Sequence, residues 1–117
     1  MEIVAFLGND KETWGQIVAL INRAEWEKII LVKNKNSEDF VSPKPCEIVN
    51  VNSDIPLIEL KKEIMDKLKG KLSEFEVALS LASGNGKEHM ALISALLSIP
   101  VGIRLVVFTK NGIEYIN

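Results

Sequence analysis

The segment FEVALSLASGNGKEHMALISALLSIPVGIRLVVF, residues 75–108, contains the pattern that decides the fold. It opens with an apolar run of the length of a buried strand, and the sequence SGNG that follows marks a turn. A helix is predicted over residues 87–99, ending before Pro100, because proline cannot continue a helix. A second buried strand is predicted over residues 103–108. A strand, a turn, a helix and a further strand in this order indicate a parallel sheet covered by helices.

The flanking sequence continues the same alternation of strands and helices. Strands are predicted over residues 3–7, 28–33 and 46–51, with one helix from about residue 12 and another within residues 53–71. The dipeptide Asn111-Gly112 predicts a hairpin that leads into a last strand at residues 113–116. This order predicts one α/β domain over residues 1–117. Its architecture would be a Rossmann-like three-layer sandwich, with a mainly parallel six-stranded sheet that ends in an antiparallel C-terminal hairpin strand.

Short polar residues mark where the predicted helices begin. Asp10 fits the N-cap of the first helix, and Ser53 or Asp54 fits that of the second, because such side chains accept hydrogen bonds from free N–H groups. Gly70 fits the end of the second helix. In a doubly wound sheet the first strand lies next to the fourth, so we expect the ligand-binding loops to be those that follow these two strands.

The composition argues against several classes of function. The 14 Lys and Arg residues nearly balance the 16 Asp and Glu residues, which argues against a partner such as duplex DNA or an acidic membrane surface. No apolar run reaches the roughly 18 residues of a membrane span, and the start MEIVAFLGND lacks the pattern of a signal peptide. A single cysteine, Cys46, and a single histidine, His89, argue against a disulfide or a metal site. We therefore expect a cytoplasmic protein that uses no metal and no cofactor.

The turn from Ser83 to Lys87 is the sharpest candidate for a site. Its glycines, Gly84 and Gly86, let backbone N–H groups approach a ligand, and the helix that follows presents free N–H groups and the positive end of its dipole. Ser83 adds a hydroxyl group and Lys87 a positive charge, which together suit a phosphate-sized anion. The P-loop and dinucleotide-binding patterns are absent. The alternative is an ordinary strand-to-helix turn with a solvated lysine.

The loop after the first strand, residues 8–13, is the second candidate. It would face the Ser83–Lys87 turn across one crevice, where Asn9 and Thr13 could bond a base or a ribose and Lys11 a phosphate. The alternative is a capped helix start. The predicted ligand-binding residues of both loops and of the helix that follows are Gly8, Asn9, Asp10, Lys11, Thr13, Ser83, Gly84, Asn85, Gly86, Lys87 and His89.

The helix predicted over residues 87–99 is apolar nearly all the way round. A helix on one face of a small sheet should be polar on its outer side, so something else is expected to cover this one. A second subunit is the economical choice, which predicts a homodimer through this helix. The alternative is that the neighbouring helix and the loops bury it.

These residues resemble the CARF family, the CRISPR-associated Rossmann-fold domains. The resemblance rests on the strand FEVALSL, the turn Ser83-Gly84-Asn85-Gly86-Lys87, the apolar helix, the strand GIRLVVF and the closing hairpin strand. The family pattern at the turn is Ser/Thr-Gly-Gly-Thr-Lys; here Ser83, Gly84 and Lys87 match, while Asn85 and Gly86 replace the second glycine and the threonine.

The resemblance implies a homodimeric sensor that binds a cyclic oligoadenylate in antiviral defence. The chain ends directly after its last strand, so we expect no effector domain, as in the ring nucleases that cleave the messenger. In that chemistry the ribose 2′-OH attacks the adjacent phosphate without a metal. The catalytic residues would be Lys87, which stabilises charge, and Ser83, which holds the phosphate with the backbone of the turn.

Two other classes of function stay open at this point. The chain could be a non-catalytic assembly module that docks another protein through its apolar helix. It could also be a Rossmann-like enzyme that acts on a mononucleotide.

Overall fold

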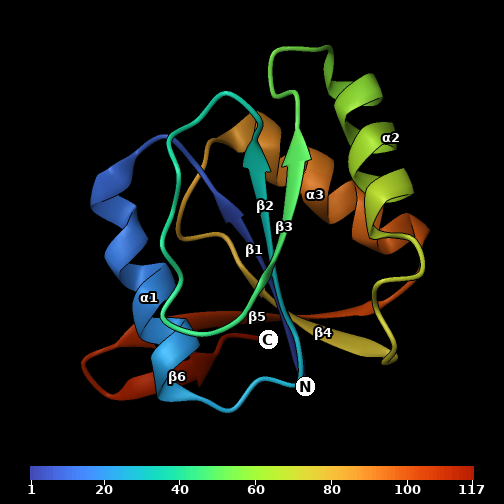
Figure 1. Ribbon diagram of the computed structural model, residues 1–117. Helices are drawn as coiled ribbons and strands as arrows, with labels where there is room; N and C mark the ends of the chain where they lie inside the picture. The colour runs from blue at the N-terminus through green and yellow to red at the C-terminus, as the bar shows by residue number, and fades with distance from the viewer.

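The structure is a computed structural model that describes residues 1–117, in which a six-stranded sheet lies between two layers of helices (Figure 1). The strands are β1 (Glu2–Leu7), β2 (Ile29–Asn34), β3 (Glu47–Val51), β4 (Glu76–Ser80), β5 (Gly102–Thr109) and β6 (Gly112–Tyr115). The helices are a short 3-10 helix, η1 (Lys11–Thr13), and the α-helices α1 (Trp14–Arg23), α2 (Leu57–Leu68) and α3 (Gly86–Ser98).

The strand order in the sheet is β3-β2-β1-β4-β5-β6. The first five strands in this order run parallel, and β6 pairs antiparallel with β5. The predicted fold class and the predicted neighbours β1 and β4 are confirmed. The chain order reverses between these two strands, and it is beyond their carboxyl ends that such sheets bind ligands.

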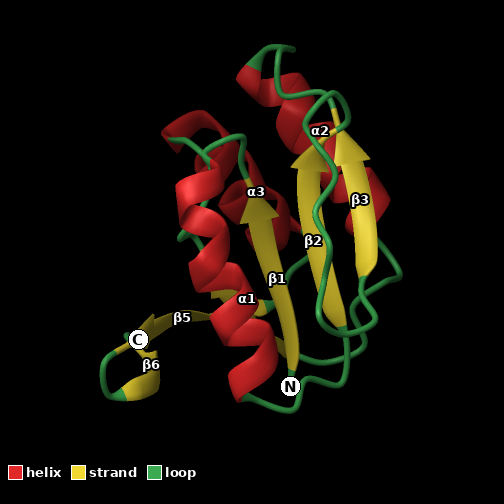
Figure 2. Cartoon of the chain, turned by 60° about the vertical axis from the view of Figure 1, so that its left-hand side comes forward, coloured by secondary structure: helices red, strands yellow, loops and turns green.

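The two faces of the sheet build two separate apolar cores. Along β1, Val4 and Phe6 point into the core beneath α2 and α3, while Ala5 and Leu7 point into the core beneath α1. Figure 2 shows α1 alone on its side of the sheet. Both faces of β1 and β2 are buried, as is usual for the central strands of a parallel sheet.

The predicted N-cap residues of the first two helices are wrong. Asp10 precedes η1 rather than α1, and its side chain makes no capping hydrogen bond. Helix α2 begins after Pro56, two to three residues beyond the predicted caps Ser53 and Asp54. Proline is favoured near a helix start because its fixed φ suits the first turn. Gly70 lies just beyond the end of α2, with a φ of 79°.

The β5–β6 hairpin closes the sheet at the predicted place, with Lys110 and Asn111 in the turn. Gly112, with a φ of 99°, supplies the left-handed backbone conformation that the turn needs. The two ends of the chain lie at the same edge of the sheet, where the parallel strands begin: the Tyr115 hydroxyl is 3.7 Å from the Met1 sulfur, and the Asn117 amide donates to the Ile103 carbonyl oxygen at the start of β5.

Candidate functional site

The loops that follow β1 and β4 touch each other directly. The Gly8 N–H donates to the Ser83 hydroxyl oxygen at 2.8 Å, across 75 residues of sequence. A Cβ atom on Gly8 would lie 2.5 Å from the Cα atom of Gly84, so only glycine fits there. Gly84 itself has a φ of 101°, which a residue with a side chain rarely adopts. The close approach of these loops depends on both glycines.

Asp10 joins the two loops instead of capping a helix. Its Oδ1 atom accepts a hydrogen bond from the Gly84 N–H at 3.2 Å and a longer one from the Ser83 hydroxyl at 3.4 Å. Its Oδ2 atom has no hydrogen-bond partner in the protein. Thr13 is the residue that precedes α1, and its hydroxyl donates to the Asp10 carbonyl oxygen at 2.7 Å. The Thr13 hydroxyl is therefore engaged within its own loop.

The start of α3 carries a reciprocal cap. The Asn85 side chain accepts from the Glu88 N–H, and the Glu88 carboxylate accepts from the Asn85 N–H. The other oxygen of Glu88 accepts from the Ser53 hydroxyl at 2.7 Å, which ties the loop before α2 to α3. The N–H groups of Gly86 and Lys87 have no partner in the protein and remain at the positive end of the helix dipole.

A polar cavity of about 350 Å³ lies over these loops. Its volume is within the range of sites for small ligands. Backbone and side chains of both loops form its wall, so the cavity lies at the point where the strand order reverses. Its lining residues are Asn9, Asp10, Gly84, Asn85 and Glu88.

The two residues predicted to be catalytic do not line this cavity. Ser83 is completely buried, and its hydroxyl joins Gly8 to Asp10. The Lys87 ammonium donates to the Ser53 carbonyl oxygen at 2.8 Å, on the side of α2. Ser83 thus positions the two loops, whereas Lys87 has a flexible side chain at the edge of the site.

Two further predicted residues have partners inside the protein. The Nε2 atom of His89 lies 2.7 Å from the Ser83 carbonyl oxygen. Because a carbonyl oxygen only accepts, Nε2 carries the hydrogen, and in the neutral ring Nδ1 is left as an acceptor. The Lys11 ammonium forms an ion pair with the carboxylate of Glu38, in the loop after β2.

The sequence did not reveal that the loop after β2 would reach this site. Lys33, at the end of β2, is only 5% exposed, and its ammonium donates to the Asn34 and Ser37 carbonyl oxygens and to the Asn50 side chain at 3.3–3.5 Å. These contacts hold the loop over the carboxyl end of β2. The strand order would have predicted it: β2 lies next to β1 and runs parallel to it, so the loops that follow these two strands lie side by side.

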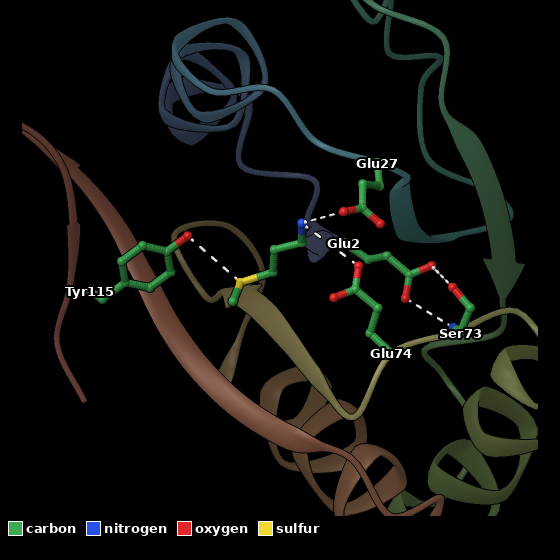
Figure 3. A network of polar contacts seen from close by, with 6 residues as sticks. Glu2, Glu27, Ser73, Glu74 and Tyr115 are labelled. Carbon is green, nitrogen blue, oxygen red and sulfur yellow. Dashed lines mark hydrogen bonds and ion pairs between the residues drawn. The ribbon is translucent and has the colours of Figure 1, made fainter.

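A second polar cluster lies at the opposite edge of the sheet, around the amino group of Met1 (Figure 3). That group is 3.2 Å from a Glu27 oxygen and 3.7 Å from a Glu74 oxygen. The hydrogen bond to Glu27 raises the pKa of the amino group. The hydrogen bond between the two carboxyl groups lowers the pKa of Glu27 and raises that of Glu74. Both oxygens of the buried Glu2 carboxylate accept hydrogen bonds from Ser73.

Comparisons with known proteins give no relatives: no family model, no curated protein and no solved structure matches this chain. None of its helices has the length and apolar character needed to cross a membrane.

Proposed function

We propose that this chain is a ligand-sensing domain that binds a cyclic oligoadenylate at the cavity between the loops of β1 and β4. One observation carries the proposal. The start of α3 contributes Asn85 and Glu88 to the wall of the cavity, and the free N–H groups of Gly86 and Lys87 follow Asn85 directly; Asp10, with its free Oδ2 atom, lines the same cavity. N–H groups at a helix start suit a phosphate, and a carboxylate oxygen suits a ribose hydroxyl. The CARF resemblance of the same turn supports a cyclic oligoadenylate as the nucleotide.

The hydrogen bonds of the carboxylates in the cavity wall reduce their repulsion of a phosphate. One oxygen of Asp10 and both oxygens of Glu88 accept hydrogen bonds from the protein, which spreads their negative charge over backbone and hydroxyl groups. Lys87 supplies the positive charge. Its ammonium reaches a phosphate at the start of α3 by exchanging one neutral oxygen, the Ser53 carbonyl, for a charged one.

The ligand is proposed to bind to a homodimer formed through α3. Most of one side of this helix is buried under α2 and against the sheet, but Met90 and Leu97 are 59% and 61% exposed. They are seven residues apart and share one face of the helix. Ile58 of α2, 75% exposed, adds to the same apolar surface beside Met90. This surface supports a homodimer, and it also supports the second candidate function, assembly with another protein.

We propose binding rather than cleavage as the function. In-line attack by a ribose 2′-OH needs groups that orient the nucleophile and stabilise the charged phosphate. Ser83 is enclosed between Gly8 and Asp10 and does not contact a ligand in the cavity. Lys87 is then the single charged contact to the phosphate, which is enough for affinity.

The test is a titration by calorimetry with cyclic tetra- and hexa-adenylate. Both rings are incubated with the protein afterwards and analysed for cleavage. Lys87→Ala should weaken binding by about 1–3 kcal/mol, because a charge-assisted hydrogen bond is lost. Lys110→Ala, in the remote hairpin turn, is the matched control and should bind like the wild type. Sedimentation of Met90→Lys against the wild type measures the contribution of α3 to dimer formation.

Four results would contradict or change parts of this proposal. Absence of binding to either ring would exclude the sensor function, and binding of AMP alone would favour an enzyme acting on a mononucleotide. Cleavage of the ring by the wild type but not by Lys87→Ala would extend the function to catalysis. A monomeric wild type at binding concentrations would exclude the homodimer.

A further inference from the structure

A smaller cavity of about 180 Å³ adjoins the first one and shares Asn9 with it. It lies between the start of α1 and the loop after β2, so it is formed at the carboxyl ends of two neighbouring strands. Its lining residues are Asn9, Lys11, Trp14, Asn36, Ser37 and Glu38. Because Asn9 lines both cavities, they are neighbours on the surface of the protein.

Trp14 gives this cavity a fixed aromatic wall. Its indole N–H donates to the Gly8 carbonyl oxygen at 2.9 Å, and its ring packs edge-on against Phe40 at 5.5 Å between ring centres. These two contacts hold the plane of the indole. The Lys11 ammonium lies 5.9 Å from the centre of the ring, so positive charge is already present over one face.

The polar side chains of the cavity include two unused amides. The side chains of Asn9 and Asn36 line it and have no hydrogen-bond partner in the protein. The buried Lys33 ammonium fixes the loop that carries Asn36 through its bond to the Ser37 carbonyl oxygen. The ion pair between Lys11 and Glu38 joins this loop to η1 on the far side of the cavity.

We propose that this second cavity holds an adenine base, stacked on Trp14, of the nucleotide whose phosphate lies at the start of α3. An aromatic ring stacks on any base, and an amide offers one donor and one acceptor in a plane. That pair matches the N6 amino group and N7 of adenine, whereas guanine presents two acceptors at the same edge. Asn9 and Asn36 therefore read the base, and Trp14 binds it. The proposal rests on the proposed function, since both cavities take the same ligand.

The experiment uses the intrinsic fluorescence of the full chain. Trp14 and Trp26 are its two tryptophans. Trp26 lies beyond the other end of α1, with its indole N–H bonded to the Leu20 carbonyl oxygen. The variant Trp26→Phe leaves Trp14 as the sole reporter. Titration with cyclic tetra-adenylate should quench its emission, with the same Kd that calorimetry gives for the wild type.

Variants of the base site supply the second measurement. Trp14→Leu should weaken binding of cyclic tetra-adenylate about 5- to 150-fold, the usual loss for one stacked base. Asn36→Ala should lower the preference for cyclic tetra-adenylate over cyclic tetra-guanylate about tenfold or more. Asn22→Ala, at an exposed position on α1, is the matched control and should leave both affinities unchanged. Circular dichroism of each variant checks that it is folded.

The outcomes separate the two proposals. Binding by calorimetry with unchanged Trp14 emission and an unchanged Kd in Asn36→Ala would overturn the base site and leave the proposed function standing. Equal affinity of the wild type for the adenine and guanine rings would overturn the assignment to adenine. No binding of either ring in calorimetry would overturn the proposed function and, with it, this inference.

Discussion

Replacing Gly8 by alanine tests whether the direct contact of the β1 and β4 loops holds the site together. The added Cβ atom would lie 2.5 Å from the N and Cα atoms of Gly84, a separation that real Cβ atoms do not show, and it would also meet the Asp10 carboxylate. The loops must separate, which weakens the bond from Gly8 to Ser83 and that from Gly84 to Asp10. These bonds contribute about 1 and about 2 kcal/mol.

Overpacking destabilises the folded state by about a further 1–3 kcal/mol. Alanine also lowers the conformational entropy of the unfolded chain, which offsets about 0.4–1 kcal/mol of this loss. We therefore expect Gly8→Ala to lower the free energy of unfolding by about 3–5.6 kcal/mol. In a chain of this length that corresponds to a fall in Tm of about 12–22 °C.

Urea unfolding followed by circular dichroism measures this loss, and thermal unfolding checks the Tm. The matched control is Gly15→Ala in α1, where an added Cβ atom would meet nothing within 4 Å. Alanine is the better helix former, so this variant should gain up to about 1 kcal/mol. If Gly8→Ala unfolds within about 0.5 kcal/mol of the wild type, as a surface substitution does, the reasoning about the loop contact is refuted.

Three further predictions concern charged groups. Glu88→Ala should lower the free energy of unfolding by about 2 kcal/mol in urea, because the cap of α3 and the bond from Ser53 are both lost; a value near zero would show that water replaces them. Lys33→Met should change that free energy by less than about 1 kcal/mol, since desolvation of the ammonium offsets its bonds, but hydrogen exchange in residues 35–38 should become faster; unchanged exchange would contradict the assigned contact. The pKa of the Met1 amino group is raised above its unfolded value by the bond to Glu27, so its stabilising effect is complete below about pH 8 and is lost as the pH rises through the folded pKa. Unfolding measured from pH 7 to 10 should show this loss in the wild type and a smaller one in Glu27→Gln.

The sheet could be predicted from the sequence because its strands are apolar runs separated by turns and helices with a different spacing. The residues of β1 and β2 are buried on both faces of the sheet, and strands buried in this way are runs of apolar residues. The hairpin was equally readable, since Asn111-Gly112 is a local signal that needs no distant partner. The position of the first strand next to the fourth was likewise expected from the alternation of strands and helices, and the sheet confirms it.

The partners of the polar side chains could not be predicted, because they depend on contacts between distant segments. Asp10 has the residue type of a cap, but its carboxylate bonds to Gly84 from 74 residues away. Ser53 likewise bonds to Glu88 rather than to its own helix. Lys33 is the last residue of the strand predicted over residues 28–33, and its burial depends on the folded loop after β2. The fold and the positions of the loops could therefore be predicted from the sequence, whereas the hydrogen-bond partners of the candidate side chains could not.

The shared position of the two chain ends gives the protein a practical property. Met1 and Tyr115 are in contact at the edge of the sheet where the parallel strands begin. Both cavities are lined by loops at the other edge, beyond the carboxyl ends of the parallel strands. A fluorescent protein or a surface tether attached at either end would leave the cavities open. A short linker could also join the ends into a ring, and new ends could be cut elsewhere, which would make a circular permutant. The fold is thus suited to reporters in which a label at the chain ends signals a ligand bound at the opposite edge of the sheet.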